Sequence, residues 1–297
     1  MRTRTFSSLL VLLIASRAAG TPAEQSITIA DLTVQVWSTD VHSTPQPVVI
    51  FSHGLHGCAT QSRFLMEALA SAGYMVFAPN HRDASCGKRG ELRRASASSE
   101  SGAQPAPLGR PSGWTPASYR DRAGDITRLV DALRRDSRFA SRSDWTRIAL
   151  AGHSLGGYTV LGLAGAWPDW KLRNVTVKAV LALSPYAQPF QTHHTLDGLS
   201  SPVMYQGGTR DIGITPWVQK GDGAYAQSPS PKYFVEFENA GHFAWTNLQT
   251  TAHQSIVVYS VAFLNHYVKG DPADAGLTQA RPDVAQLRYE SEIGTRR

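Results

Sequence analysis

The stretch Gly152-His153-Ser154-Leu155-Gly156 places a serine between two glycines, each two positions away from it. The apolar, partly β-branched residues Ile148 to Ala151 come directly before this stretch and predict a buried strand. The apolar residues from Leu155 to about Ala166 follow it and predict a helix. A serine on a sharp turn between a strand and a helix stands clear of the backbone, and glycines at these two positions remove side chains that would collide there. We therefore expect Ser154 to be an exposed nucleophile.

Short β-rich segments alternate with longer helical patterns along the chain, which is typical of a mostly parallel sheet with helices on both faces. The predicted helices are residues 63–72, 126–133, 155–166 and 256–268. The predicted strands are residues 27–29, 32–37, 48–51, 74–78, 148–151, 179–183, 203–206 and 233–237, of which the first two form an antiparallel pair. No internal repeat or interdomain linker divides the chain, so we expect an α/β protein with one eight-stranded sheet and a single domain.

A serine hydroxyl is a weak nucleophile until a neighbouring base takes its proton. In folds that place a serine on such a turn, an acid and then a histidine follow it along the chain. His242 lies just after the last predicted strand and is the predicted base. Asp211 follows the strand before that and is the predicted acid, which would fix the imidazole tautomer and stabilise the imidazolium. Asp222 is the alternative acid, although it lies farther from the strand end.

Nucleophilic attack on a carbonyl also needs two donors for the oxyanion. The backbone N–H of Leu155 is the first candidate, because it follows the nucleophile and opens a helix. The backbone N–H of Leu55 is the second, because Ser52-His53-Gly54-Leu55 forms the loop after the strand at 48–51. We expect His53 to hold this loop in place and not to act as the base.

No metal site is predicted. His193 and His194 are adjacent in the chain, with no third ligand at metal-binding spacing. The two cysteines, Cys58 and Cys86, are not in a CxxC or similar pattern. The expected chemistry requires neither a metal nor an organic cofactor.

Several segments also carry a family resemblance. They are Phe51-Ser52-His53-Gly54-Leu55, Leu69-Ala70-Ser71-Ala72-Gly73-Tyr74, His81-Arg82-Asp83, Gly152-His153-Ser154-Leu155-Gly156-Gly157 and Ala240-Gly241-His242-Phe243. Together they resemble the platelet-activating-factor acetylhydrolase and dienelactone-hydrolase-like branch of the α/β-hydrolase superfamily. The second half of the chain is also similar to bacterial cutinases and polyester hydrolases. The resemblance covers residues 34–268 and implies the α/β-hydrolase fold and the hydrolysis of an ester.

Two positions depart from the families. Dienelactone hydrolases have a cysteine nucleophile, where this chain has Ser154. The animal acetylhydrolases carry their acid after the sixth strand, where this chain has Ser184, and Asp211 instead matches the acid position of the bacterial esterases. The resemblance therefore implies the type of reaction without naming the substrate.

The fold implied by the resemblance also bears on the cysteines. Cys58 follows the strand at 48–51 and Cys86 follows the strand at 74–78, and these strands are neighbours in that architecture. An isolated pair of cysteines in an oxidising compartment usually forms a disulfide, and two buried thiols are the alternative. We expect a Cys58–Cys86 disulfide that stiffens the loop of Leu55.

The N-terminus has the pattern of a signal peptide. Arg2 and Arg4 precede an apolar run over residues 9–15, and small residues follow at 18–20. The apolar run is too short to cross a bilayer as a stable anchor. We expect residues 1–20 to be removed, with the cut between about residues 20 and 24, and the mature protein to be secreted or periplasmic.

The net charge of +6 comes from arginines that are scattered along the chain. Nucleic-acid binding would need a clustered basic stripe with interleaved aromatic residues, and we do not expect it. The composition leaves the oligomeric state open.

The catalytic domain is expected over residues 25–270. Residues 85–118 are rich in Ser, Arg, Gly and Pro, which predicts a long loop, either a partial lid or a surface excursion. Residues 271–297 are polar and predict a flexible tail. The candidate walls of an apolar substrate pocket are aromatic residues close to the motif loops: Tyr158, Tyr186, Trp217 and Trp245.

The sequence thus predicts a secreted serine hydrolase that cleaves carboxylic esters through an acyl-enzyme. No large cap insertion is visible, which favours short or medium acyl esters or accessible polyesters, so the expected partner is a small or polymeric ester. An amidase or thioesterase with the same residues is the alternative. A non-catalytic binding protein on the same scaffold is the third interpretation.

Overall fold

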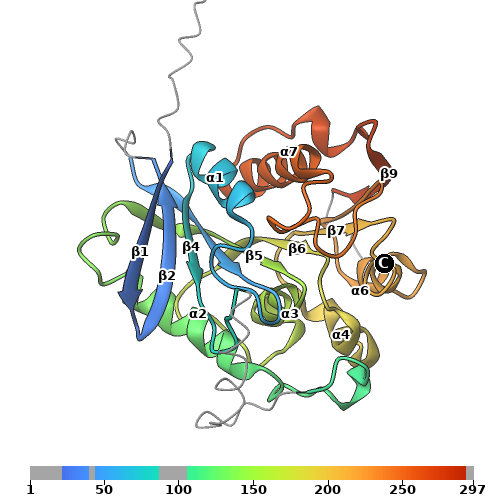
Figure 1. Ribbon diagram of the computed structural model, residues 1–297, viewed down its shortest axis with the longest axis horizontal. Coiled ribbons are helices and arrows are strands. Elements are labelled where there is room, and N and C mark those ends of the chain that lie inside the picture. Colours follow the sequence, from blue (N-terminus) through green and yellow to red (C-terminus); the bar gives the residue numbers. More distant parts are fainter. Residues whose placement is uncertain (1–21, 40–43, 87–105, 292–297) are drawn as a thin grey trace, which may run out of the picture.

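The computed structural model describes residues 22–39, 44–86 and 106–291. A nine-stranded sheet with the order β1-β2-β4-β3-β5-β6-β7-β8-β9 runs through the molecule, and helices cover both of its faces (Figure 1). The strands are β1 (Ala23–Ile29), β2 (Leu32–Ser38), β3 (Gln46–Ser52), β4 (Met75–Pro79), β5 (Ser143–His153), β6 (Val177–Leu183), β7 (Val203–Gly208), β8 (Lys232–Phe237) and β9 (Val284–Glu290). Strands β3 to β8 are parallel, whereas β1, β2 and β9 pair antiparallel with their neighbours. The predicted α/β class is confirmed.

The helices fall at the predicted places, with short additions. They are α1 (Arg63–Ser71), α2 (Arg120–Leu133), α3 (Leu155–Leu161), α4 (Gln188–His193), α5 (Thr215–Gln219), α6 (Ala224–Gln227) and α7 (His253–Leu264). Short 3₁₀ or π turns are η1 (Pro111–Gly113), η2 (Gly162–Ala166), η3 (Leu196–Gly198), η4 (Asn265–Lys269) and η5 (Ala275–Leu277). In the described ranges, none of these helices has the length and hydrophobicity that crossing a bilayer requires.

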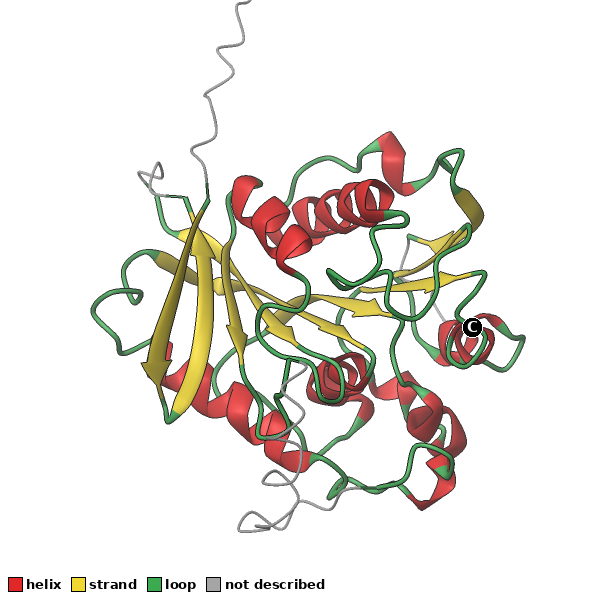
Figure 2. Ribbon diagram, in the orientation of Figure 1, coloured by secondary structure: helices red, strands yellow, loops and turns green. Residues whose placement is uncertain are grey.

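The central strands are buried on both faces, which explains their nearly continuous apolar sequences. Every residue of β3 is buried. Val48 and Ile50 pack into the core layer of α2 and α3, whereas Val49 and Phe51 pack into the layer of α1 and α7. Figure 2 shows these two helical layers on opposite sides of the sheet. Alternate side chains of each strand therefore hold the two layers together.

The parallel strands bring the predicted site residues to one edge of the sheet. The loops after β3, β5, β7 and β8 carry Leu55, Ser154, Asp211 and His242 respectively. Because the carboxyl ends of parallel strands meet at the same edge, residues far apart in the sequence become neighbours there.

The sheet has one strand more than the eight that the sequence predicts. Within the expected flexible tail, β9 pairs with β8 from Val284 opposite Phe237 to Glu290 opposite Lys232. The Tyr289 ring stacks on the Tyr233 ring, with 6.0 Å between the centroids. Most β9 residues are exposed or half-buried, so the strand lacks the apolar alternation by which a strand is recognised. The strand β9 forms because the edge of β8 is available for pairing, and the sequence pattern does not show this pairing.

The segment 85–118 is only partly described, and the expected loop at 87–105 lies outside the described residues, as does the expected signal peptide. Most of residues 106–118 are exposed, but Trp114 and Ser118 are buried. The Trp114 ring is fully buried, and its Nε1–H donates to the Pro107 carbonyl at 3.0 Å. Trp114 therefore anchors this exposed segment to the domain through its buried ring, whose centroid lies 4.9 Å from that of the Tyr158 ring.

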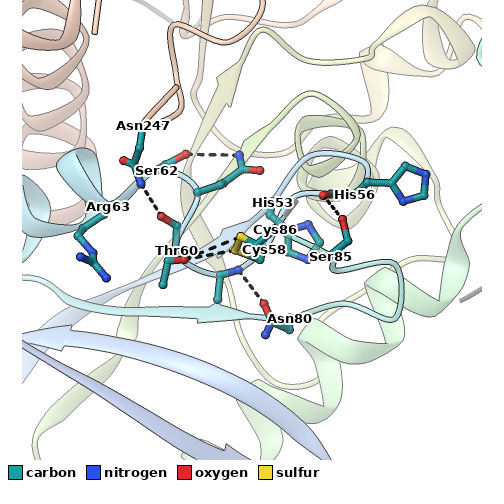
Figure 3. Close-up of a disulfide and its surroundings, with 12 residues drawn as sticks. His53, His56, Cys58, Thr60, Ser62, Arg63, Asn80, Ser85, Cys86 and Asn247 are labelled. Carbon is teal, nitrogen blue, oxygen red and sulfur yellow. Dashed lines mark hydrogen bonds between the residues drawn. A yellow bond between two sulfur atoms is a disulfide. The ribbon is translucent and has the colours of Figure 1, made fainter. Parts of the chain in front are cut away.

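The Cys58–Cys86 disulfide is present, with 5.2 Å between the Cα atoms. It joins the loop after β3 to the loop after β4 (Figure 3). Close by, the Ala59 N–H donates to the Asn80 side chain at 2.7 Å, and the Asn247 side chain donates to the Thr60 carbonyl at 2.8 Å. The loop that carries Leu55 is thus connected to the segment after β4 and to the segment of Asn247. The disulfide is the connection that the sequence predicts.

Replacing both cysteines by serine is expected to lower the free energy of unfolding. The disulfide closes a loop with a sequence separation of 28, for which the chain-entropy estimate is about 3–4 kcal/mol. Urea unfolding of the double variant and the wild type measures the difference. Reduced wild type should match the variant, and a thiol assay that finds two free thiols in the unreduced, denatured protein would contradict the disulfide.

Candidate active site

Ser154 lies on a strained turn between β5 and α3. Its backbone has φ 55° and ψ −116°, outside the regions that non-glycine residues usually adopt. A Cβ at Gly152 would lie 2.3 Å from the Gly156 carbonyl oxygen, and a Cβ at Gly156 would lie 1.9 Å from the Ser52 carbonyl oxygen. The structure therefore requires both glycines, for the steric reason that the motif suggests.

The structure brings Ser154, His242 and Asp211 together. The His242 Nε2 lies 3.0 Å from the Ser154 Oγ, and the His242 Nδ1 lies 3.2 Å from an Asp211 carboxylate oxygen. Asp211 is buried. An Nδ1–H directed at a carboxylate leaves the Nε2 lone pair free to accept the serine proton. The alternative acid, Asp222, pairs with Lys220 at 3.4 Å and its side chain is 80% exposed.

Ser184 is a member of this cluster that the sequence analysis did not assign. Its Oγ–H donates to the second Asp211 oxygen at 2.5 Å, and the same Oγ lies 2.8 Å from the His242 Nδ1. The Thr215 hydroxyl also donates to Asp211, at 3.2 Å. Because Ser184 gives its one proton to the carboxylate, the Nδ1–H of His242 faces two acceptors, the Ser184 hydroxyl and the Asp211 carboxylate. The only signal in the sequence is the position of Ser184, directly after β6.

The candidate oxyanion donors lie beside Ser154. A Cβ at Gly54 would lie 3.4 Å from the Ser154 Cβ, so the loop after β3 packs directly against the nucleophile turn. Within the part of the chain that the structure describes, neither the Leu55 N–H nor the Leu155 N–H donates to a protein acceptor. Leu155 is the first residue of α3, where the helix dipole adds positive potential. Both N–H groups are available to a ligand.

A cleft with two compartments flanks Ser154. The compartments have volumes of about 430 and 420 Å³ and share Leu55, Leu108, Ser154 and His242. The first is further lined by His153, Phe243, Thr246, Asn247 and Leu248, among others. The second is further lined by Leu155, Tyr186, Gln188, Ile214 and Trp217, among others. Large apolar side chains are thus gathered around Ser154, and Leu248 and Phe243 are 82% and 54% exposed.

Two models of known protein families match this chain. The family model described as PET hydrolase-like matches residues 116–288, which is more than half of the chain. The chain belongs to the PET hydrolase-like family. A second model, described as platelet-activating factor acetylhydrolase, isoform II, matches residues 12–108. Both resemblances inferred from the motifs are confirmed, and the chain has the α/β-hydrolase fold.

Curated relatives agree with this assignment. Cutinase est1 of Thermobifida alba is 30% identical over 154 residues, which is 50% of this chain and 47% of the relative. A cutinase of Thermobifida fusca (strain YX) is 31% identical over 140 residues, 46% of this chain and 41% of the relative. A bis(hydroxyethyl) terephthalate hydrolase of Streptomyces coelicolor is 25% identical over 152 residues, 50% of this chain and 44% of the relative. The chain spans about half the length of the curated relatives it matches.

Two of the four aromatic residues expected to line the substrate pocket are core residues in this PET hydrolase-like chain. Tyr186 and Trp217 line the cleft. Tyr158 and Trp245 are fully buried, however, and the Trp245 Nε1–H donates to the Gln206 side chain at 2.9 Å. Proximity to a motif in the sequence does not show which way a ring points, and α3 directs Tyr158 into the core against the rings of Trp114, Trp170 and Phe190.

His153, the residue before the nucleophile, holds the loop of His242. Burial, together with the nearby His242, lowers the pKa of His153 to about 3, so its ring is neutral. Its Nε2 lies 2.8 Å from the His242 carbonyl oxygen and its Nδ1 lies 3.1 Å from the Gln61 amide nitrogen. The neutral tautomer that satisfies both donates from Nε2 and accepts at Nδ1. The sequence analysis assigned no role to this position.

The remaining histidines of interest have structural contacts. The His193 Nε2 lies 2.8 Å from the Trp114 carbonyl oxygen. His53 is buried in the loop before Leu55, as expected. Over residues 22–39, 44–86 and 106–291, no group of three histidine, cysteine or acidic side chains is arranged to hold a metal ion.

Ser184→Ala is expected to slow the covalent labelling of Ser154 by a fluorophosphonate probe about tenfold. The variant loses the short hydrogen bond from Ser184 to the Asp211 carboxylate, and hydrogen bonds to charged groups contribute about 1.5–3 kcal/mol. Ser184→Thr keeps the hydroxyl and should label at close to the wild-type rate. Wild-type labelling of Ser184→Ala would show that the Ser184 contacts have no effect on the reactivity of Ser154.

Proposed function

We propose that this protein is a secreted serine hydrolase that cleaves carboxylic esters through an acyl-enzyme. The observation that carries the proposal is the chain of contacts from Ser154 through His242 to the buried Asp211, at 3.0 and 3.2 Å, beside a cleft that Ser154 and His242 line. Membership of the PET hydrolase-like family supports the same reaction.

In the first half of the reaction, the Ser154 Oγ attacks the ester carbonyl carbon while the His242 Nε2 takes the hydroxyl proton. The carbonyl oxygen becomes an oxyanion that accepts hydrogen bonds from the N–H groups of Leu55 and Leu155. The tetrahedral intermediate then collapses, the bond to the alcohol oxygen breaks, and His242 gives its proton to the departing alcohol. The product of this half is an acyl group on Ser154.

In the second half, His242 takes a proton from a water molecule that attacks the acyl carbonyl. The bond between the carbonyl carbon and the Ser154 Oγ breaks, and the proton returns to that oxygen. Asp211 holds the imidazole in the productive tautomer and stabilises the imidazolium in both halves. The reaction consumes one water and releases one carboxylic acid and one alcohol.

The shape of the cleft indicates the substrate class. Both compartments reach Ser154, so an ester bond placed there has space on each side of it. Apolar and aromatic side chains wall both compartments. Leu248 and Phe243 expose apolar surface at the rim, where they can contact a substrate larger than the cleft. We propose short or medium acyl esters and accessible polyesters, in agreement with relatives named as cutinases and a terephthalate ester hydrolase.

Two proposals concern the organisation of the chain. Residues 1–20 are proposed as a signal peptide, so that the protein acts outside the cytoplasm. The catalytic domain is proposed to begin near residue 25 and to extend past residue 270 to the end of β9, because β9 completes the sheet.

The first test is turnover of a p-nitrophenyl ester series, from acetate to palmitate, by the mature protein and its Ser154→Ala variant. We expect a maximum at a short or medium chain length. Ser154→Ala should lower kcat by about 10⁴-fold or more with an unchanged circular dichroism spectrum. Matched amide and thioester substrates should turn over more slowly than the ester. Faster turnover of either would make the protein an amidase or thioesterase, and no turnover of any of them by folded protein would favour a binding role.

The acid is tested by two matched substitutions. Asp211→Asn should lower kcat by about 10⁴-fold, because the amide favours the wrong imidazole tautomer. Asp222→Asn, at an exposed position, should leave kcat unchanged. Loss of activity in Asp222→Asn with retention in Asp211→Asn would overturn the assignment of the acid.

A further inference from the structure

A buried arginine lies behind the loop of Leu55. Arg122 comes from the first turns of α2 and is only 1% exposed. Its Nη1–H donates to the His53 carbonyl at 2.7 Å, and its Nη2–H donates to the Gly54 carbonyl at 3.2 Å. These are the two peptide carbonyls directly before Leu55. A buried guanidinium is costly unless it is paired, so its position calls for a specific explanation.

Asp83 pairs with Arg122 and also binds the same loop on the other side of Leu55, at His56. Its Oδ1 accepts from the Arg122 Nε–H at 3.1 Å and lies 2.8 Å from the Arg122 Nη2. Its Oδ2 lies 2.7 Å from the same Nη2. It also accepts the backbone N–H of His56 at 3.0 Å. Burial alone raises the pKa of Asp83, but Arg122 outweighs it and lowers this pKa well below its ordinary value. The pair is therefore ionised, and it holds the peptide groups before and after Leu55.

His53 adds a further donor to the Gly54 carbonyl. Burial, and then the charge of Arg122, lowers the pKa of His53, so the ring is neutral. Its Nε2 accepts the His81 backbone N–H at 3.0 Å, which leaves the proton on Nδ1. The Nδ1–H donates to the Gly54 carbonyl at 2.8 Å, and the Gly57 N–H donates to the same oxygen at 3.0 Å. This oxygen thus accepts from three donors, one of them charged.

The geometry of the peptide bond connects this carbonyl to the reaction. The Gly54 C=O and the Leu55 N–H belong to one planar, trans peptide group, so they point in opposite directions. Fixing the oxygen toward Arg122 therefore fixes the hydrogen on the opposite side of the peptide, and Leu55 lines the same cleft as Ser154. Hydrogen bonds to the oxygen also polarise the peptide, which makes its N–H a stronger donor.

We propose that Arg122, held by Asp83, is a positioning residue that sets the direction and strength of the Leu55 N–H as an oxyanion donor. The proposal rests on the proposed function, because it assigns Leu55 to the oxyanion. It predicts that Arg122 stabilises the tetrahedral intermediate and not the bound ester.

The test uses Arg122→Lys, Arg122→Gln and the control Arg135→Gln in the mature protein. A lysine keeps the charge beside Asp83, but one ammonium cannot replace the planar fork that reaches two carbonyls and a carboxylate. Both Arg122 variants should lower kcat for a p-nitrophenyl ester about 10- to 100-fold, with Arg122→Gln affected more and KM within about twofold. Deleting a whole oxyanion donor costs about 10²–10³-fold in kcat, which sets the upper limit.

A second readout separates positioning from folding. A trifluoromethyl ketone forms a tetrahedral adduct whose oxygen occupies the oxyanion position, so its Ki should rise by the same factor as kcat falls. Fluorophosphonate titration counts the competent sites, and kcat is expressed per site. Arg135 is exposed just after α2, and Arg135→Gln should match the wild type in every measurement.

The outcomes are distinguishable. Folded Arg122 variants whose kcat per site and trifluoromethyl ketone Ki match the wild type would overturn this inference while leaving Ser154-dependent turnover intact. A rise in KM with an unchanged ketone Ki would overturn it as well. A wild type without Ser154-dependent turnover would overturn the proposed function and this inference with it.

Discussion

The close packing of the Ser154 turn against the end of β3 is the constraint on which the site depends. Gly156 lies so near the Ser52 carbonyl that no other residue fits there. This contact places Ser154 and the loop of Leu55 side by side, although they are about one hundred residues apart in the chain. The strained backbone of Ser154 is tolerated because buried strands on both sides of β5 hold the turn in place.

Polar groups around this contact hold two N–H groups in place, the Nδ1–H of His242 and the backbone N–H of Leu55. Asp211 and Ser184 surround the Nδ1 of His242, and His153 holds the His242 carbonyl. On the other side of Ser154, Arg122 holds the carbonyl of the peptide that contains the Leu55 N–H. In a buried environment these bonds are stronger than in water, so each donor is held in one orientation before a substrate arrives.

The sequence predicted the parallel strands, the main helices and the Cys58–Cys86 disulfide. It also grouped Ser154, Asp211 and His242, which the structure places within hydrogen-bonding distance, while their catalytic roles stay a prediction. It missed β9, because a half-exposed edge strand has no distinctive periodicity and is defined by the strand beside it. It placed Tyr158 and Trp245 in the pocket, whereas both are core residues. Their direction depends on how a helix or loop is rotated against the sheet, and residue type does not encode that rotation.

By itself, then, the sequence determined the strand–turn–helix that carries Ser154 and the chain order of Asp211 and His242. Both are local or ordered along the chain, and glycine and apolar spacing express them directly. Only the tertiary structure decided that Ser184 contacts Asp211 and His242, and that Arg122 lies behind Leu55. Ser184 meets Asp211 and His242 because the parallel strands β6, β7 and β8 end at one edge of the sheet, whereas Arg122 reaches the loop of Leu55 from the first turns of α2. The residue types of Ser184 and Arg122 alone do not show that they make these contacts.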